Sequence, residues 1–162
     1  MKRAVFVAML TMLMMVGSVV ASAAYPPEYL NDRDLILSGH LDGTAWYIDK
    51  NSVQVEQEEP PMYIITYQVF AARYDVNTGE VTRVFEAMPH RCRYDVDKTM
   101  MFSFNFNRDY SQWALVKPDE QGGPIEYSGE LAWYIAYGTK FYGNGYPSYF
   151  KDEIYVRVDN AH

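Results

Sequence analysis

The sequence predicts an α+β domain in which a curved antiparallel sheet of about six or seven strands packs against one helix in the C-terminal half. Short segments of alternating apolar and polar residues recur between residues 35 and 116, separated by turn-forming residues. One later segment, residues 128–142, carries its apolar residues at helical spacing instead. A small closed β-barrel is the alternative, and it differs in enclosing a cavity between its inward faces.

Residues 1–24 have the composition of a secretory signal peptide. Basic residues Lys2 and Arg3 precede an apolar run over residues 4–20, and the small residues Ala21-Ser22-Ala23-Ala24 follow. This order of charged, apolar and small regions predicts cleavage after Ala23 and export of the remaining chain. Retention as a membrane anchor is the alternative, but a run of 17 residues lies at the lower limit for a spanning helix.

The mature chain is expected to form a single domain over residues 35–162, preceded by a lead-in over residues 25–34. Pro26 and Pro27 favour an extended conformation in that lead-in. After cleavage we expect the protein to be periplasmic, wall-associated or secreted, with no membrane contact. The sequence indicates no oligomeric state.

The charge of the chain argues against nucleic acids as partners. The whole sequence has a formal net charge of −7, and two of its 14 basic residues lie in the signal peptide, so the mature chain is still more acidic. Such a chain repels phosphate backbones and anionic lipids and offers no basic stripe. We therefore expect no nucleic-acid partner.

The first strands follow from turn residues that divide apolar segments. After an apolar start at residues 35–37, residues 45–48 and 53–56 flank the turn Asp49-Lys50-Asn51-Ser52, which predicts a hairpin. The strongest strand pattern covers residues 62–74. By the two-residue period of a strand, its apolar face consists of Tyr63, Ile65, Tyr67, Val69 and Ala71.

The next strands alternate as clearly. The turn Asn77-Thr78-Gly79 leads into a return strand over residues 80–88. The next strand, residues 91–97, places Cys92 on its apolar face, so we expect a buried and unreactive thiol. Since this is the only cysteine, no intramolecular disulfide can form. A further amphipathic strand has an apolar face that consists of Met100, Phe102, Phe104 and Phe106.

The C-terminal part is expected to contain an edge strand, the helix and a last strand. Residues 112–116 form the edge strand and residues 153–158 the last strand. Ser128 is expected to cap the N-terminus of the helix, with Glu130 in its first turn. Gly138 is expected inside the helix, which would end at Gly143.

No catalytic, metal or cofactor site is indicated. The histidines His40, His90 and His162 lie apart from one another at no metal-ligand spacing. The segment 105–109 resembles the start of a calcium loop but lacks the glycine and the acidic residue that such a loop needs later. Asp95 and Asp97 could form the carboxylate pair of a polysaccharide hydrolase, but they are interleaved with arginines on one face. Charge pairs between strands explain them better.

The best candidate for a binding surface is a second aromatic stripe on the helix. Trp133, Tyr137 and Phe141 lie on the side away from Leu131, and Tyr146 follows nearby. Two apolar faces indicate either a helix buried on both sides, under the adjacent glycine-rich loop, or an exposed recognition stripe.

Two segments resemble a known family. The element Trp46-Tyr47-Ile48-Asp49-Lys50-Asn51-Ser52-Val53, followed by two long strands and Cys92-Arg93-Tyr94-Asp95-Val96, resembles the surface-adhesin E-like family of small exported bacterial proteins. The resemblance covers residues 45–107 and implies an antiparallel sheet packed on a helix, and binding to matrix proteins. Members of that family close a disulfide, which Cys92 alone cannot form.

Together these observations predict a non-enzymatic, adhesin-like exported protein that binds a protein or a glycan. A small periplasmic hydrolase of polysaccharide or cell wall that uses Asp95 or Asp97 is one alternative. A purely structural protein of the cell envelope is the other.

Overall fold

The computed structural model describes residues 23–105, 112–116, 124–142 and 152–161. Their elements are β1 (Tyr29–Leu30), β2 (Leu35–Leu41), β3 (Thr44–Asp49), a 3-10 turn η1 (Lys50–Ser52), β4 (Gln54–Glu59), β5 (Met62–Tyr74), β6 (Val81–Asp95), β7 (Met100–Asn105), β8 (Gln112–Val116), α2 (Pro124–Tyr137) and α3 (Asp152–Asn160).

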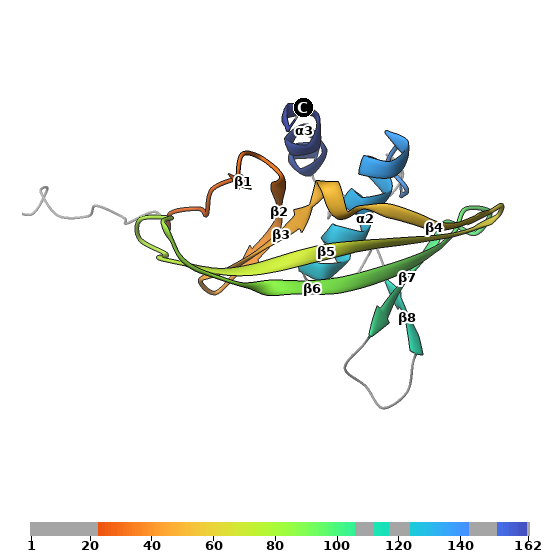
Figure 1. The fold of residues 1–162 in the computed structure, drawn as a ribbon, viewed down its shortest axis with the longest axis horizontal. Helices are drawn as coiled ribbons and strands as arrows, with labels where there is room; N and C mark the ends of the chain where they lie inside the picture. Colours follow the sequence, from red (N-terminus) through yellow and green to blue (C-terminus); the bar gives the residue numbers. More distant parts are fainter. Residues whose placement is uncertain (1–22, 106–111, 117–123, 143–151, 162) are drawn as a thin grey trace, which may run out of the picture.

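The fold is α+β, as predicted. Eight antiparallel strands form one open sheet in the order β1-β2-β3-β5-β6-β7-β8, and β4 pairs with β5 beside that path. The closed-barrel alternative is therefore wrong. Figure 1 shows α2 and α3 on one side of the long strands β5 and β6. None of the helices in the described part is long and apolar enough to cross a membrane.

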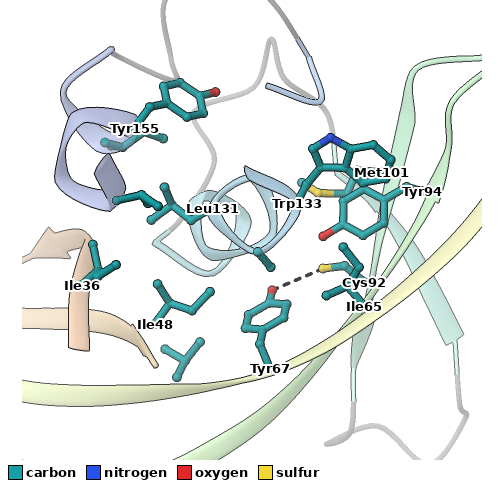
Figure 2. Packing of buried hydrophobic residues seen from close by; sticks show 14 of the residues in the cluster. Ile36, Ile48, Ile65, Tyr67, Cys92, Tyr94, Met101, Leu131, Trp133 and Tyr155 are labelled. Atoms are coloured by element: carbon teal, nitrogen blue, oxygen red, sulfur yellow. Dashed lines mark hydrogen bonds between the residues drawn. The ribbon is translucent and has the colours of Figure 1, made fainter. Parts of the chain in front are cut away.

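The main core lies between α2 and the sheet. The alternation predicted for β5 is confirmed at Ile65, Tyr67 and Val69, whose side chains are buried in this core. Leu131 of α2 and Ile48 of β3 belong to the same cluster (Figure 2). The two-residue period of the strands thus selects the face that α2 covers.

A second, smaller core lies on the opposite face of β2, β3 and the end of β5. Its buried members are Leu35, Leu37, Ala45, Tyr47, Ala72 and Tyr74. The lead-in contacts this end of the sheet, because the Tyr47 hydroxyl donates to the Pro27 carbonyl over 3.0 Å and Leu30 packs on the cluster. The residues that follow the predicted cleavage site are therefore part of the folded domain.

Helix α2 is where the sequence predicts a helix, but both of its ends differ. It begins at Pro124, so Ser128 is not its cap; the buried Ser128 hydroxyl donates to Ser38 Oγ over 2.9 Å. It ends at Tyr137, because Gly138 has φ of +67° and its N–H donates to the Tyr134 carbonyl. Glycine adopts this left-handed conformation without steric cost, so Gly138 ends the helix instead of lying inside it.

Helix α3 replaces the last predicted strand. Ile154, Val156 and Val158 alternate in sequence, but Ile154 and Val158 are buried four residues apart while Val156 is 50% exposed. That spacing is helical. Arg33 donates to the carbonyl of Asn160, the last residue of α3, and Lys50 donates to the carbonyl of Ala161, which follows it. Both cations lie at the negative end of the helix. These long-range contacts favour the helix and are invisible in the local pattern.

The apolar face of β7 also differs from the prediction. Tyr94 pairs with Met101 and Arg93 pairs with Phe102. Because Tyr94 points into the main core, Met101 points there too and is buried, whereas Phe102 and Phe104 lie on the opposite face of the sheet. Phe102 and Phe104, which were expected in the core, therefore lie on the face away from α2, and Phe106 lies outside the described residues.

Candidate functional site

The predicted helix stripe is part of the interior. Trp133 is only 8% exposed, and its ring lies 5.4 Å from that of Tyr63 and 4.9 Å from that of Tyr94, centroid to centroid. Tyr137 and Phe141 are half-buried and also contact the Trp133 ring. The sheet itself covers this stripe, while Tyr146 lies outside the described residues.

A different set of side chains forms a surface on the face of the sheet away from α2. We call it the outer surface, and it consists of Arg91, Arg93, Phe102, Phe104, Trp113 and Leu115. The pairing of Phe102 with Leu115 and of Phe104 with Trp113 puts the apolar members on one side of the β7–β8 hairpin. Leu115 is 43% exposed.

Arginines cover the aromatic rings of the outer surface. The guanidinium carbon of Arg93 lies 4.5 Å from the ring centroid of Phe102 and 5.1 Å from that of Trp113. Arg91 lies 5.6 Å from the same Trp113 ring, which packs edge-on against Phe104 at 5.1 Å. Cations over aromatic faces and edge-to-face ring pairs are both attractive, so these side chains hold one another in place.

The two arginines differ in their charge partners. Arg91 forms an ion pair with Glu56 of β4, and its Nε lies 2.7 Å from a carboxylate oxygen. Arg93 has no carboxylate partner among the described residues, and its Nε is buried without an acceptor. Among the described residues, no carboxylate therefore offsets the charge of Arg93 beside this ring-lined, partly exposed surface.

Tyr142 fixes the hairpin that carries the surface. Its hydroxyl accepts from the Met101 N–H over 3.2 Å and donates to the Val116 carbonyl over 2.9 Å. Met101 and Val116 are paired residues of β7 and β8, so one buried hydroxyl links both strands to the segment that follows α2. This link anchors the end of the hairpin to the main core.

The two aspartates considered for hydrolysis lie at the end of β6 and in the turn that follows it. Asp95 is buried and accepts from the Lys98 ammonium over 2.8 Å and from the Lys98 N–H over 3.2 Å. The side-chain hydrogen bond from Lys98 lowers the pKa of Asp95, as expected for a structural turn carboxylate. Asp97 is exposed in the turn. The pairing of these aspartates with Arg91 and Arg93 is wrong, since Arg91 pairs with Glu56.

The described histidines lie apart. The Nδ1 atom of His40 lies 3.2 Å from the Tyr74 hydroxyl, whereas His90 stacks on Tyr67 and burial lowers its pKa. Within the described ranges, no group of three His, Cys, Asp or Glu residues could hold a metal ion. His162 and the candidate calcium segment after Asn105 lie outside the described residues.

Cys92 is buried, as predicted. Its side chain is 1% exposed, and its Sγ lies 3.3 Å from the Tyr67 hydroxyl (Figure 2). Gly129 of α2 passes so close that an added Cβ would lie 3.0 Å from this sulfur. The thiol thus lies at a close contact between the helix and the sheet.

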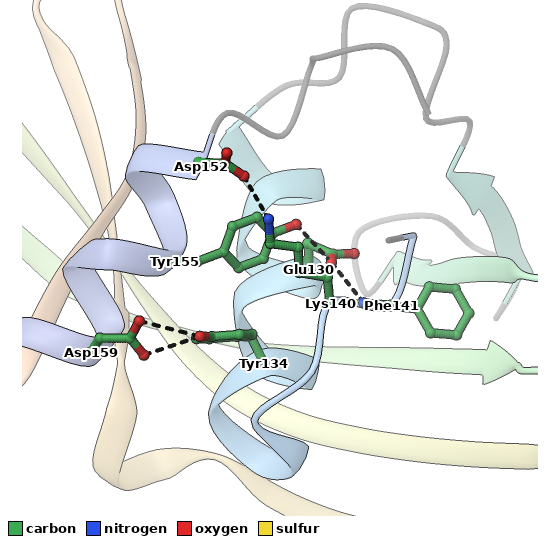
Figure 3. Close-up of polar contacts among 7 residues, drawn as sticks. All are labelled: Glu130, Tyr134, Lys140, Phe141, Asp152, Tyr155 and Asp159. Atoms are coloured by element: carbon green, nitrogen blue, oxygen red, sulfur yellow. Dashed lines mark hydrogen bonds and ion pairs between the residues drawn. The ribbon is translucent and has the colours of Figure 1, made fainter. Parts of the chain in front are cut away.

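A buried carboxyl group connects α2 with α3 (Figure 3). Glu130 is fully buried, and one of its oxygens accepts from the Phe141 N–H and from the Tyr155 hydroxyl, each over 2.8 Å. Burial raises its pKa, against the opposing effect of these hydrogen bonds. The prediction that Glu130 lies in the first turn of the helix is wrong, since α2 begins six residues earlier at Pro124.

The described residues line open clefts beside the helices. One, of about 540 Å³, lies between the lead-in, β2 and α3 and is lined by residues that include Glu28, His40 and Arg157. Arg157 is already engaged there by Glu28 and by the Leu37 carbonyl. Another, of about 410 Å³, lies between α2 and α3 and includes Lys50.

The outer surface was not predicted, although its signal is in the sequence. Arg91 and Arg93 occupy alternate positions of β6, and Phe102 and Phe104 occupy alternate positions of the next strand, β7. If both pairs are assigned to the same face of the sheet, the arginines lie beside the phenylalanines. Comparisons with protein-family models, curated proteins and solved structures found no match to this chain.

Proposed function

We propose that this chain is a non-enzymatic, exported binding module that contacts a macromolecular partner, a protein or a glycan, through the outer surface. The observation that carries the proposal is the group of arginines and aromatic rings on a sheet face that no described helix covers. The signal-peptide pattern of residues 1–24 supports export. The resemblance to the surface-adhesin E-like family supports an adhesin-like role.

The composition of the outer surface suits recognition. Trp, Phe and Arg are enriched in binding interfaces, and Trp and Arg contribute most often to their affinity. In this chain Trp113 contacts both Phe104 and Arg93, and the three residues lie on paired strands, so their side chains are ordered before a partner arrives. A pre-ordered surface loses less conformational entropy on binding.

The arrangement also explains why recognition by the helix stripe is the weaker proposal. Trp133 is covered by Tyr63 and Tyr94, so a partner could reach it only if α2 separated from the sheet. The outer surface requires no such rearrangement.

The experiment uses the purified mature chain on an array of extracellular-matrix proteins and glycans. Wild type is expected to bind at least one class, and Arg93→Gln is expected to weaken that binding by at least about tenfold. Val156→Ala is the matched control, because Val156 is exposed on α3, away from the outer surface. Its binding should equal that of wild type.

Two results would contradict the proposal. Turnover of cell-wall or polysaccharide substrates by the same preparation would favour the hydrolase alternative. Absence of both binding and turnover would favour a structural role in the envelope.

A further inference from the structure

Strand β8 ends the sheet beside the outer surface. It pairs with β7 on one edge, and no described strand pairs with its other edge. Its sequence, Gln-Trp-Ala-Leu-Val, contains no charged residue and no proline. Soluble proteins usually protect an edge strand with such residues, because the unpaired backbone groups can otherwise accept another strand.

The hydrogen bonds show which backbone groups of β8 face this edge. The Tyr142 hydroxyl bridges the Met101 N–H and the Val116 carbonyl, so this residue pair directs its backbone groups into the space between β7 and β8. In an antiparallel ladder the direction alternates along each strand. The N–H and carbonyl groups of Trp113 and Leu115 therefore point to the open edge.

The side chains at the same positions face the outer surface. Trp113 and Leu115 pair with Phe104 and Phe102, so an additional strand would place alternate side chains directly beside the indole of Trp113 and the exposed Leu115. The Arg93 guanidinium lies over the Trp113 ring at 5.1 Å and has no carboxylate partner in the described part of the chain. An acidic side chain next to Trp113 would supply that partner.

We infer that β8 binds an extended segment of a partner protein as a ninth strand of the sheet. The segment carries an acidic side chain beside Trp113, paired with Arg93, and an aliphatic side chain two residues away beside Leu115. Backbone hydrogen bonds supply the affinity of such strand addition, and alternate side chains supply its selectivity. The inference rests on the proposed function, since it assigns the partner chemistry of the same surface.

The test measures fluorescence anisotropy of a labelled peptide, Thr-Val-Thr-Glu-Thr-Val-Thr, with the mature chain. This sequence presents a glutamate flanked by valines in either strand direction. Replacing the glutamate by lysine should weaken binding at least about tenfold, because the positive charge of the lysine would then lie next to that of Arg93. Methylating the peptide backbone nitrogens on the hydrogen-bonding edge should abolish binding, since it removes the ladder donors.

Protein variants test the same contact from the other side. Leu115→Pro removes an N–H that points to the open edge and leaves the bonds to β7 in place, so peptide binding should be lost. Leu115→Lys introduces the charge with which natural edge strands block pairing, and it tests the edge if the proline variant fails to fold. Arg93→Gln should lose the preference for glutamate over lysine.

Several results would overturn the inference. They are the absence of peptide binding at millimolar concentration, equal binding of the methylated peptide, and full binding by Leu115→Lys. If the array partner still binds the outer surface in any of these cases, strand addition is wrong while the proposed function stands. If the array shows binding to glycans only, and Leu115→Lys binds them as tightly as wild type, strand addition is likewise wrong while the proposed function stands.

Discussion

Replacing Trp133 by alanine tests whether the helix stripe is core. The side chain is 8% exposed and contacts the rings of Tyr63, Tyr94, Tyr137 and Phe141 at centroid distances between 4.5 and 5.4 Å. Truncating a buried tryptophan to alanine costs about 3 to 5 kcal/mol of unfolding free energy. The total unfolding free energy of a domain is about 5 to 15 kcal/mol, so this loss removes a large part of it.

The matched variant is Trp113→Ala on the outer surface. Trp113 is half-buried, and its described ring contacts are Phe104 and the two arginines Arg91 and Arg93. An aromatic pair and surface cation–π contacts together contribute about 1 to 2 kcal/mol. Both variants remove the same atoms, so the difference between their losses of stability reports only how the two side chains are surrounded in the folded protein.

Thermal melts followed by circular dichroism separate the two environments. The loss at Trp133 corresponds to a decrease in the melting temperature of about 10 °C or more for a chain of this length, and the loss at Trp113 to about 3 to 7 °C. Equal decreases, or a decrease below about 5 °C for Trp133→Ala, would refute the assignment of the helix stripe to the core.

The remaining predictions concern the contact between α2 and the sheet. Gly129→Ala should destabilise by about 1 to 3 kcal/mol in urea titrations, because its Cβ would lie 2.9 Å from Met101 Sδ; a gain in stability, as helix propensity alone predicts, would contradict this packing. Cys92 should react with a bulky thiol reagent only after denaturation, and rapid labelling of the native chain would show that the thiol is accessible. Burial raises the pKa of Glu130, so the folded state holds this proton more tightly than the unfolded state. The contribution of this carboxyl to stability should fall as the pH rises from its unfolded pKa, about 4.3, through its raised pKa in the folded state. Glu130→Gln should reduce this fall in urea titrations at several pH values, and parallel curves for the two proteins would argue against it.

The strand pattern of β5 was predictable because its burial follows a local period. Ile65, Tyr67 and Val69 all face one helix, so two-residue alternation is sufficient to identify them. The burial of Cys92 followed from the same rule, since its neighbours on β6 alternate between charged and apolar side chains.

The face of β7 was not predictable by that rule. In residues 100–106, Met100 and three phenylalanines form one alternating set, and Met101 is the one large apolar residue of the other. Alternation therefore favours the phenylalanine set for the core, although Met101 is the residue that faces it. The pairing of Met101 with Tyr94 decides which set faces α2, and this register depends on the turn between β6 and β7. The outer surface was missed for this reason.

Helix α3 shows a second limit of local patterns. Ile154, Val156 and Val158 are β-branched and alternate, which favours a strand by propensity. Tyr155 is nevertheless buried, because its hydroxyl donates to Glu130 of α2. This tertiary contact, together with Arg33 and Lys50 at the C-terminal carbonyls, overrides the local preference.

The most direct test of the proposed function changes each of the two aromatic surfaces in turn and measures the affinity for the same partner. The dissociation constant of the array partner is measured for wild type, Trp113→Ala on the outer surface and Tyr137→Phe on the helix stripe. We predict at least about tenfold weaker binding for Trp113→Ala and a change below about twofold for Tyr137→Phe. Unchanged binding by a folded Trp113→Ala, or the larger loss with Tyr137→Phe, would contradict recognition through the outer surface.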